Sequence, residues 1–282
     1  MEFGVFSFNT DYGIRADTLA MALEDRGFDS LWVGEHTHIP ASRLSPYPGG
    51  GDLPRPYYHM VDPFVSLMAA AGATKKLKLG TGICLVIERD PITLAKEVAS
   101  LDFLCNGRFL FGIGGGWNAE EMENHGTQFS RRWKVLRENI EAMKAIWRDE
   151  EASYEGEFVN FDRIISYPKP VQTPHPPIIY GGITSQGIKR IARYCDGWLP
   201  FDIDGPKLDA LAAELRIEME KVGRDPDTIS TSVFCFGRPD PKKLEHFRAL
   251  GAERVVMVAP RQADATMAFL DDVTPLVEAE SS

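Results

Sequence analysis

The chain has 282 residues, of which 44% are hydrophobic and 26% are charged, and its formal net charge at pH 7 is −10. This length fits either two ordinary domains or one α/β barrel of about 250 residues. The negative balance argues against nucleic acid or an anionic membrane as a partner, because both need a basic surface. The first residues read as a strand without a basic leader, and no apolar run approaches membrane-spanning length. We therefore expect a cytoplasmic protein.

Strand patterns alternate with amphipathic helix patterns along the whole chain. The predicted strands are Phe3–Phe8, Ser30–Gly34, Lys78–Ile83, Phe109–Ile113, Ile178–Gly182, Gly197–Phe201, Ser230–Phe236 and Arg254–Val258. The predicted helices are Arg15–Arg26, Asp62–Thr74, Pro91–Cys105, Arg132–Trp147, Ser185–Tyr194, Pro206–Val222, Pro241–Leu250 and Gln262–Leu270. Such alternation is typical of parallel βαβ units. Eight units without a compositional break favour a single (β/α)₈ TIM-barrel domain over residues 1–282 rather than an open sheet.

Two insertions depart from a minimal barrel. Residues 35–60 follow the second strand and are rich in proline, glycine and aromatic residues. They are expected at the carboxyl ends of the strands, either as a lid or pocket wall or as a solvated decoration. Residues 149–177 precede the fifth strand and contain a hairpin pattern around Gly156. We expect this hairpin to approach from the amino-terminal face, with a structural role such as an oligomer contact.

The four cysteines, Cys84, Cys105, Cys195 and Cys235, lie far apart and mostly in apolar runs. This distribution is typical of buried free thiols in a reducing compartment. Neither a disulfide nor a metal site is predicted from them.

Glycine follows two consecutive predicted strands. The third strand ends in Thr81-Gly82-Ile83, and the fourth is followed by Gly114-Gly115-Gly116-Trp117-Asn118. Because the carboxyl ends of parallel strands share one edge, a planar ligand could lie there against backbone without side chains. Trp117 would stack on such a ring or close the rim, and Phe6 would lie beneath the ring or in the core. The alternative is that these glycines only relieve crowding.

An anion site is predicted after the fifth strand. Gly181, Gly182, Thr184 and Ser185 form a glycine turn that leads into a helix. Free N–H groups at a helix start bind anions, helped by the helix dipole. The alternative is an ordinary Thr or Ser N-cap after a glycine turn.

Charged residues end the second strand. Glu35 and His36 at this place are candidates for proton transfer or ligand contact, because His titrates near neutral pH. The spacing of His36 and His38 also suggests a metal site, to which Asp202 and Asp204 could contribute. No other histidine is placed at a strand end, so no metal site is predicted. An ordinary loop ion pair is the remaining alternative.

These motifs together resemble the bacterial luciferase-like family of flavin and deazaflavin oxidoreductases, and most of all its F420-dependent branch. The resemblance covers nearly the whole chain. Its most specific pieces are Gly34–Pro40, Leu79–Ile83 with Arg89-Asp90-Pro91, Gly107–Phe109 through Asn118, and Gly181-Gly182 with Asp196-Gly197-Trp198.

The resemblance implies a (β/α)₈ barrel with the flavin or deazaflavin at the carboxyl ends of the strands. Gly82 and Ile83 would form a bulge behind the central ring, often through a non-prolyl cis peptide bond. Glu35 and His36 would meet cofactor and substrate, and the Gly181–Ser185 turn would hold the cofactor's phosphate. A homodimer is also implied.

The expected function is hydride transfer between coenzyme F420 and a small organic, hydrophobic substrate. His36 would handle the proton, and Glu35 would fix its tautomer or contact the ring. The alternatives are an FMN-dependent monooxygenase that uses reduced flavin and O₂, a non-catalytic flavin-binding protein, and a metal-dependent hydrolase. Some deazaflavin dehydrogenases of the family place a glutamate just after the fourth-strand glycines, where this chain has Trp117. This departure argues against a sugar-phosphate substrate.

Overall fold

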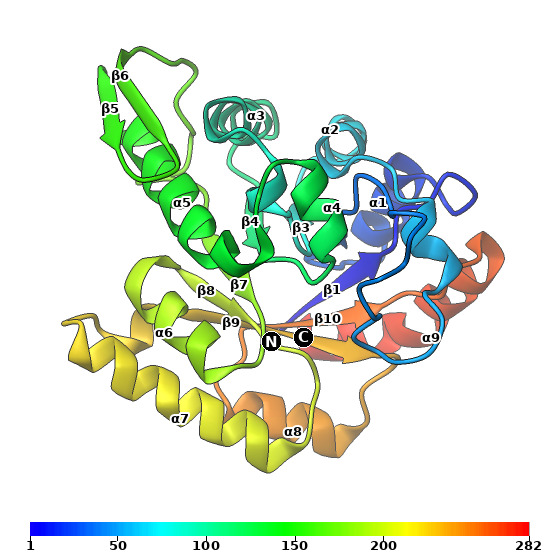
Figure 1. The fold of residues 1–282 in the computed structure, drawn as a ribbon. Coiled ribbons are helices and arrows are strands. Elements are labelled where there is room, and N and C mark those ends of the chain that lie inside the picture. Colours follow the sequence, from blue (N-terminus) through cyan, green and yellow to red (C-terminus); the bar gives the residue numbers. More distant parts are fainter. Residues whose placement is uncertain (282) are drawn as a thin grey trace.

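Eight parallel strands close into a barrel in the order β1-β10-β9-β8-β7-β4-β3-β2 (Figure 1). The computed structural model describes residues 1–281. The barrel strands are β1 (Glu2–Ser7), β2 (Ser30–Val33), β3 (Lys78–Thr81), β4 (Phe109–Ile113), β7 (Ile178–Gly181), β8 (Gly197–Leu199), β9 (Ser230–Phe236) and β10 (Arg254–Val258). The predicted (β/α)₈ barrel and its eight strands are confirmed.

Helices surround the barrel. They are α1 (Ala16–Asp25), α2 (Pro63–Ala73), α3 (Pro91–Leu104), α4 (Ala119–Asn124), α5 (Arg132–Arg148), α6 (Ser185–Tyr194), α7 (Gly205–Lys221), α8 (Pro241–Ala249) and α9 (Ala263–Ser281). Short 3₁₀ turns are η1 (Arg55–Tyr58), η2 (Val86–Glu88), η3 (Phe129–Arg131) and η4 (Pro226–Thr228). Asp62, Asp90 and Asp240 each accept an N–H of the first turn and precede a proline, which fixes where α2, α3 and α8 begin.

Two helices differ from the prediction. The short helix α4 was not predicted. Helix α9 continues past Leu270 to Ser281, because Val273 and Val277 are buried and hold its later turns against the protein. None of the helices in the described part of the chain is long and apolar enough to cross a membrane.

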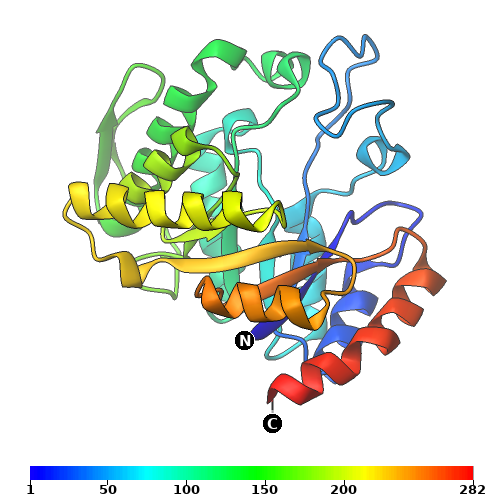
Figure 2. The same cartoon turned by 90° about the horizontal axis from the view of Figure 1, so that it is seen from below.

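The first and last barrel strands lie side by side, with β1 paired to β10 from Glu2 and Arg254 onward (Figure 2). The barrel interior is filled by a separate apolar cluster of Phe6, Trp32, Leu110, Ile179, Leu199, Phe234 and Val256. All four cysteines are buried and free, as predicted.

The hairpin of the second insertion is formed by β5 (Ala152–Glu155) and β6 (Asn160–Ile164). It projects beside α5 (Figure 1). The expectation that it approaches from the amino-terminal face is wrong for its tip. Glu138, in the second turn of α5, accepts the N–H of Phe158 at 2.7 Å, and Arg131 pairs with Glu157. Because α5 begins near the carboxyl end of β4, these contacts hold the tip at that end of the barrel.

A substitution at Gly112 in β4 would test how tightly the barrel wall is packed. A Cβ at Gly112 would lie 1.8 Å from the carbonyl oxygen of Thr81, a backbone atom that cannot move aside. We expect Gly112→Ala to lower the free energy of unfolding by about 3 kcal/mol or more. The exposed Gly72 of α2 has no atom within 4 Å of its Cβ position. Gly72→Ala, measured by the same denaturant unfolding, should therefore raise stability by about 0.5 kcal/mol. Equal stabilities for the two variants would contradict this packing.

Candidate active site

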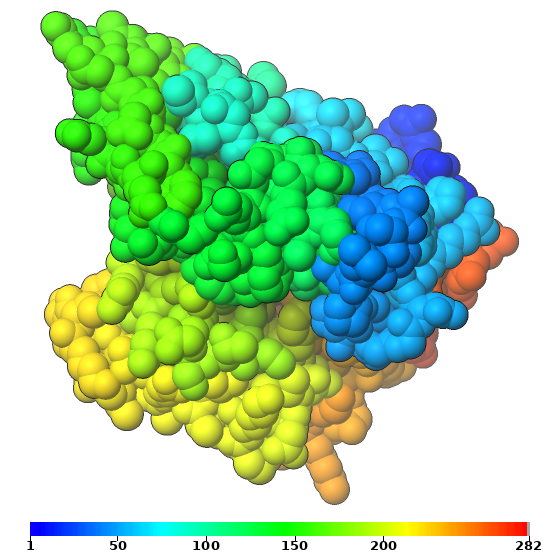
Figure 3. Space-filling view, viewed as in Figure 1, coloured from blue at the N-terminus to red at the C-terminus, as the bar shows by residue number. Residues whose placement is uncertain are grey.

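The carboxyl ends of β1, β2, β3, β4 and β7 bring the predicted site residues to one mouth of the barrel. Figure 3 shows the surface hollowed between the green segment around α4 and the yellow-green segment around α6. The blue residues of the first insertion lie at one end of this hollow. The predicted residues at this mouth are Phe6, Glu35, His36, Thr81, Gly82, Ile83, Gly114, Gly115, Gly116, Trp117, Asn118, Gly181, Gly182, Thr184 and Ser185.

Ile83 lies beside Gly114 and Gly181 at the mouth, and the peptide bond between Gly82 and Ile83 is cis, as the resemblance implied. A Cβ at Gly114 would lie 2.6 Å from Cδ1 of Ile83, and one at Gly181 would lie 2.7 Å from its Cγ2. The missing side chains at Gly114 and Gly181 therefore make room for Ile83 itself. A ligand ring at this mouth would rest on the Ile83 side chain as well as on bare backbone.

Three further mouth glycines, Gly115, Gly116 and Gly182, also have a local structural explanation. A Cβ at Gly115 would lie 2.1 Å from the Trp133 ring, and one at Gly182 would lie 2.8 Å from the Tyr180 ring. Gly116 has φ +63°, a conformation that side chains disfavour. Packing against aromatic rings thus accounts for two of these glycines and backbone conformation for the third.

His36 is held by a carboxylate that sequence reasoning missed. Its Nδ1 lies 2.6 Å from Oε2 of Glu121 on α4, and the other oxygen of Glu121 accepts the N–H of Thr37 at 3.2 Å. The side chain of Glu121 is fully buried and that of His36 is 7% exposed. When Nδ1 carries the hydrogen and donates it in a hydrogen bond to this carboxylate, Nε2 is left as the acceptor of the imidazole. Asn118, the N-cap three residues before Glu121, was the available sequence signal.

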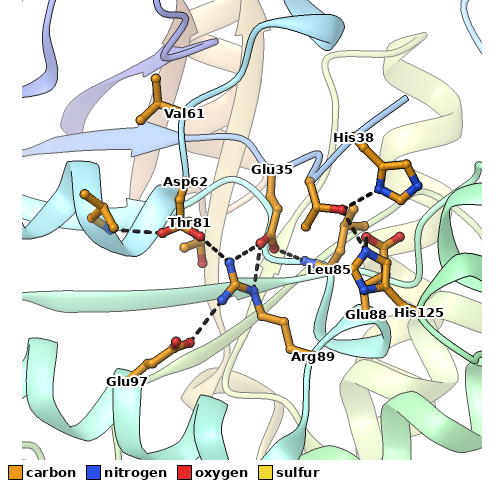
Figure 4. A network of polar contacts seen from close by, with 12 residues as sticks. Glu35, His38, Val61, Asp62, Thr81, Leu85, Glu88, Arg89, Glu97 and His125 are labelled. Carbon is orange, nitrogen blue, oxygen red and sulfur yellow. Dashed lines mark hydrogen bonds and ion pairs between the residues drawn. The ribbon is translucent and has the colours of Figure 1, made fainter. Parts of the chain in front are cut away.

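Glu35 contacts the loop after β3 and the guanidinium of Arg89. Its carboxylate accepts the N–H of Leu85 at 2.6 Å and Nε of Arg89 at 2.7 Å. Arg89 also reaches Asp62 at 2.7 Å and Glu97 at 3.0 Å (Figure 4). Of the two roles expected for Glu35, Glu121 takes the contact with Nδ1 of His36, and contact of Glu35 with the cofactor ring stays a prediction. Glu35 fastens the loop after β3 to the end of β2.

The first insertion supplies an aromatic wall beside His36. The Tyr57 ring lies 5.3 Å from the His36 ring and 5.4 Å from that of Tyr47, between ring centroids. Trp117 lies 5.7 Å from His36, and the guanidinium of Arg43 lies 5.8 Å from the Trp117 ring. The insertion therefore forms a wall of the mouth.

Three predicted ligand-contact residues are engaged within the protein. The buried Thr81 hydroxyl donates to the carbonyl oxygen of Gly112 at 2.7 Å. Asn118 is 1% exposed and caps α4, and its Nδ2 has no hydrogen-bond partner. Phe6 is 7% exposed and lies 5.2 Å from both Phe8 and Phe234, between ring centroids. Of the three, Asn118 alone keeps an unused donor.

The predicted anion turn leads into α6. Thr184 is the N-cap, and its hydroxyl oxygen accepts the N–H of Gly187 at 3.0 Å. The hydroxyl proton of Thr184 and the first N–H groups of the helix remain available to an anion. The geometry is compatible both with an anion site and with the ordinary N-cap considered above.

A pair of arginines flanks Trp133 near this turn. The guanidinium carbon of Arg190 lies 3.9 Å from the Trp133 ring centroid, and that of Arg132 lies 4.6 Å from it. Nε of Arg132 is buried without a hydrogen-bond partner. Within residues 1–281, neither arginine forms an ion pair with a carboxylate.

A second cavity, of about 650 Å³, lies outside the barrel between η2, α5 and the tip of the hairpin. Glu88 lines it with a side chain that is 1% exposed and an Oε2 that has no hydrogen-bond partner. His125 approaches this oxygen at 3.9 Å (Figure 4). Burial, and then the negative charges of Glu121 and Glu35, raise the pKa of Glu88 to about 9. Glu88 is therefore a neutral acid at pH 7.

Within residues 1–281, no group of three histidine, cysteine or acidic side chains is arranged to hold a metal ion.

The protonation state of Glu88 can be tested through the pH dependence of the protein's stability. The folded protein keeps its proton up to about pH 9, whereas the unfolded chain releases it near pH 4.5. Stability associated with Glu88 is thus complete below pH 4.5 and is lost as the pH rises to 9. We expect the stability of Glu88→Gln relative to wild type to rise by up to about 1.4 kcal/mol per pH unit in this window. Urea unfolding across the pH range measures it, and the exposed Glu123→Gln should show no such trend. A flat difference for Glu88→Gln would mean that Glu88 is ionised.

A family model described as luciferase-like monooxygenase matches residues 1–267. Rv0953c of Mycobacterium tuberculosis is 41% identical over 280 residues, covering 96% of each chain. The F420-dependent hydroxymycolic acid dehydrogenase of the same species is 28% identical over 262 residues, which cover 91% of this chain and 63% of that protein.

Two solved structures share the fold. An F420-dependent secondary alcohol dehydrogenase in complex with an F420-acetone adduct has a TM-score of 0.79 at 18% identity, with 98% of each chain covered. The oxygenating constituent of 3,6-diketocamphane monooxygenase from Pseudomonas putida, in complex with FMN, has a TM-score of 0.67 at 18% identity, covering 86% of this chain and 69% of that one. From the family match and the relative that is 41% identical, the chain belongs to the luciferase-like monooxygenase family, and it is an oxidoreductase.

Proposed function

We propose that this protein transfers a hydride between coenzyme F420 and a small hydrophobic organic substrate. The observation that carries the proposal is His36, held by the buried carboxylate of Glu121 beside an aromatic wall at the barrel mouth. Transfer of a hydride from or to a carbon that bears oxygen needs a partner for the oxygen's proton. A neutral imidazole with one nitrogen fixed by a carboxylate suits that need.

In the proposed reaction His36 moves the proton and Glu121 positions it. Nε2 of His36 accepts the proton of a substrate hydroxyl in the oxidation direction, and returns it in the reverse direction. Glu121 keeps the proton on Nδ1 and stabilises the imidazolium that forms. Glu35 holds the loop after β3 by accepting the N–H of Leu85. The deazaflavin ring, when bound, accepts or gives the hydride.

The residues at the mouth fit a phosphate-bearing cofactor with a flat ring. The first turn of α6 offers free N–H groups and the Thr184 hydroxyl to a phosphate. Gly181, Gly182 and Ile83 would line the ring side of the same crevice.

The second candidate is an FMN-dependent monooxygenase that uses reduced flavin and O₂. It is favoured by the likeness in fold to the FMN complex and by the family description. FMN carries a phosphate too, so α6 serves either cofactor. The named F420-dependent relative supports the first candidate, since its sequence similarity extends over 91% of this chain.

Cofactor choice is tested by titrating the apoprotein with F420 and with FMN and following the fluorescence of each ring. We expect F420 to bind with a dissociation constant of about 1 μM or lower, and FMN to bind more weakly. Reduced FMN and O₂ with a panel of hydrophobic ketones serve as the parallel assay. Micromolar binding of FMN without a response to F420 would replace the proposal by the monooxygenase.

The proton role of His36 is tested by substitution. His36→Ala should lower kcat by about 10²–10⁴-fold while changing the affinity for F420 little. Glu121→Gln keeps the shape but removes the charge that stabilises the imidazolium, and should lower kcat by an intermediate factor. Deazaflavin reduction with a panel of hydrophobic secondary alcohols measures both, with exposed Glu123→Gln as the control. If F420 affinity fell and kcat of the saturated variant were unchanged, His36 would bind the ring and not move a proton.

A further inference from the structure

Arg132 and Arg190 have no evident task inside the protein. Arg132 is the first residue of α5 and Arg190 lies in α6, so two separate helices bring them to the same Trp133 ring. Arg132 also lies 3.7 Å above the Phe129 ring and donates to the Phe129 carbonyl at 2.7 Å. Stacking on rings orients the guanidinium planes and leaves most of their N–H donors unused.

The placement of like charges here is costly without an anion. Burial, together with the positive charge of Arg190, lowers the pKa of Arg132. Arg190 faces the Tyr180 hydroxyl, a neutral group. Eleven other arginines in the described chain pair with carboxylates, although the chain carries 41 acidic residues. Arg132 and Arg190 lie close together without a carboxylate partner, and Nε of Arg132 is a buried donor without an acceptor. Such a pair is typical of a site that binds an anion.

The position of Arg132 and Arg190 relative to the mouth indicates which part of a bound ligand would carry the anion. Trp133 packs on Gly115, and Tyr180 packs on Gly182 and Gly187, so the arginines border both the β4 mouth and the start of α6. In the proposed function, a phosphate held by the first turn of α6 would occupy the helix N–H groups. The guanidinium groups are then available to whatever extends outward beyond that phosphate.

We propose that Arg132 and Arg190 bind the carboxylates of the oligo-γ-glutamate tail that extends beyond the phosphate of F420. This assignment rests on the proposed cofactor. Planar guanidinium groups pair with carboxylates through two parallel hydrogen bonds, which a flexible tail can satisfy without a deep pocket. FMN ends at its phosphate, so the same pair gives it no matching contact and favours the deazaflavin.

The test compares two deazaflavins that share ring and phosphate. One ends at its lactyl carboxylate, and the other carries several γ-linked glutamates. For the wild-type apoprotein, fluorescence titration should show about 10-fold tighter binding of the long-tailed form, and added NaCl should reduce that gain. Arg132→Gln and Arg190→Gln should each remove most of the gain and leave affinity for the short form within about 2-fold.

The controls separate this site from charge alone and from misfolding. Arg193→Gln removes one positive charge from an exposed position of the same helix and should keep the gain. Arg132→Lys preserves the charge near the rings and should keep part of it, with circular dichroism confirming the fold of every variant. Equal affinity of the wild type for both deazaflavins, or an equal loss in Arg193→Gln, would overturn the tail site. So would an equal drop for FMN in the Arg132 and Arg190 variants, since the pair would then bind the phosphate. Absence of any deazaflavin binding would instead refute the proposed function.

Discussion

The half-buried guanidinium of Arg89 makes the contacts on which the arrangement of the mouth depends. It joins Glu35 at the end of β2, Asp62 at the start of α2 and Glu97 in α3. Burial alone would lower the pKa of Arg89, but the negative charge of the Glu35 carboxylate raises it. The guanidinium therefore stays positively charged. Removing one member of such a pair typically costs about 3–5 kcal/mol, because the other charge is left buried without a partner. Since Glu35 also holds Leu85 and directly precedes His36, this one network sets both the loop after β3 and the place of the imidazole.

The barrel itself was predictable because its signals are local and repeated. Apolar runs recur eight times along the chain, and Asp-Pro pairs such as Asp90-Pro91 mark where several of the helices begin. Helix α4 escaped because six residues show no periodic apolar face. The tip of the hairpin was misplaced because it is held by Glu138 and Arg131, whose contacts with it leave no local pattern in the sequence.

For the candidate site, the sequence predicted which residues lie at the mouth of the barrel better than it predicted which side chains they contact. The residues at strand ends were found because parallel strands deliver their carboxyl ends to one edge. The contact between His36 and Glu121 joins residues 85 positions apart. No local sequence pattern predicts that these two side chains meet. Glycine was ambiguous for a physical reason: Gly114 looks the same in sequence whether its missing side chain makes room for a ligand or for Ile83. Polar side chains from helices, such as Arg132 and Arg190, were missed because helical arginines are usually solvated.

The place of Glu121 bears on which substrates this mouth admits. Some deazaflavin dehydrogenases of the family carry a glutamate directly after the fourth-strand glycines, whereas this chain has Trp117 there and brings a carboxylate from α4. Glu121 is fully buried behind the imidazole, so in the proposed reaction it acts only through His36. The aromatic wall beside His36 is formed by Trp117, Tyr57 and Tyr47. The guanidinium of Arg43 lies over the Trp117 ring. A wall of rings gains most from burying apolar area. It therefore favours the proposed hydrophobic substrate, with one oxygen-bearing carbon directed at His36.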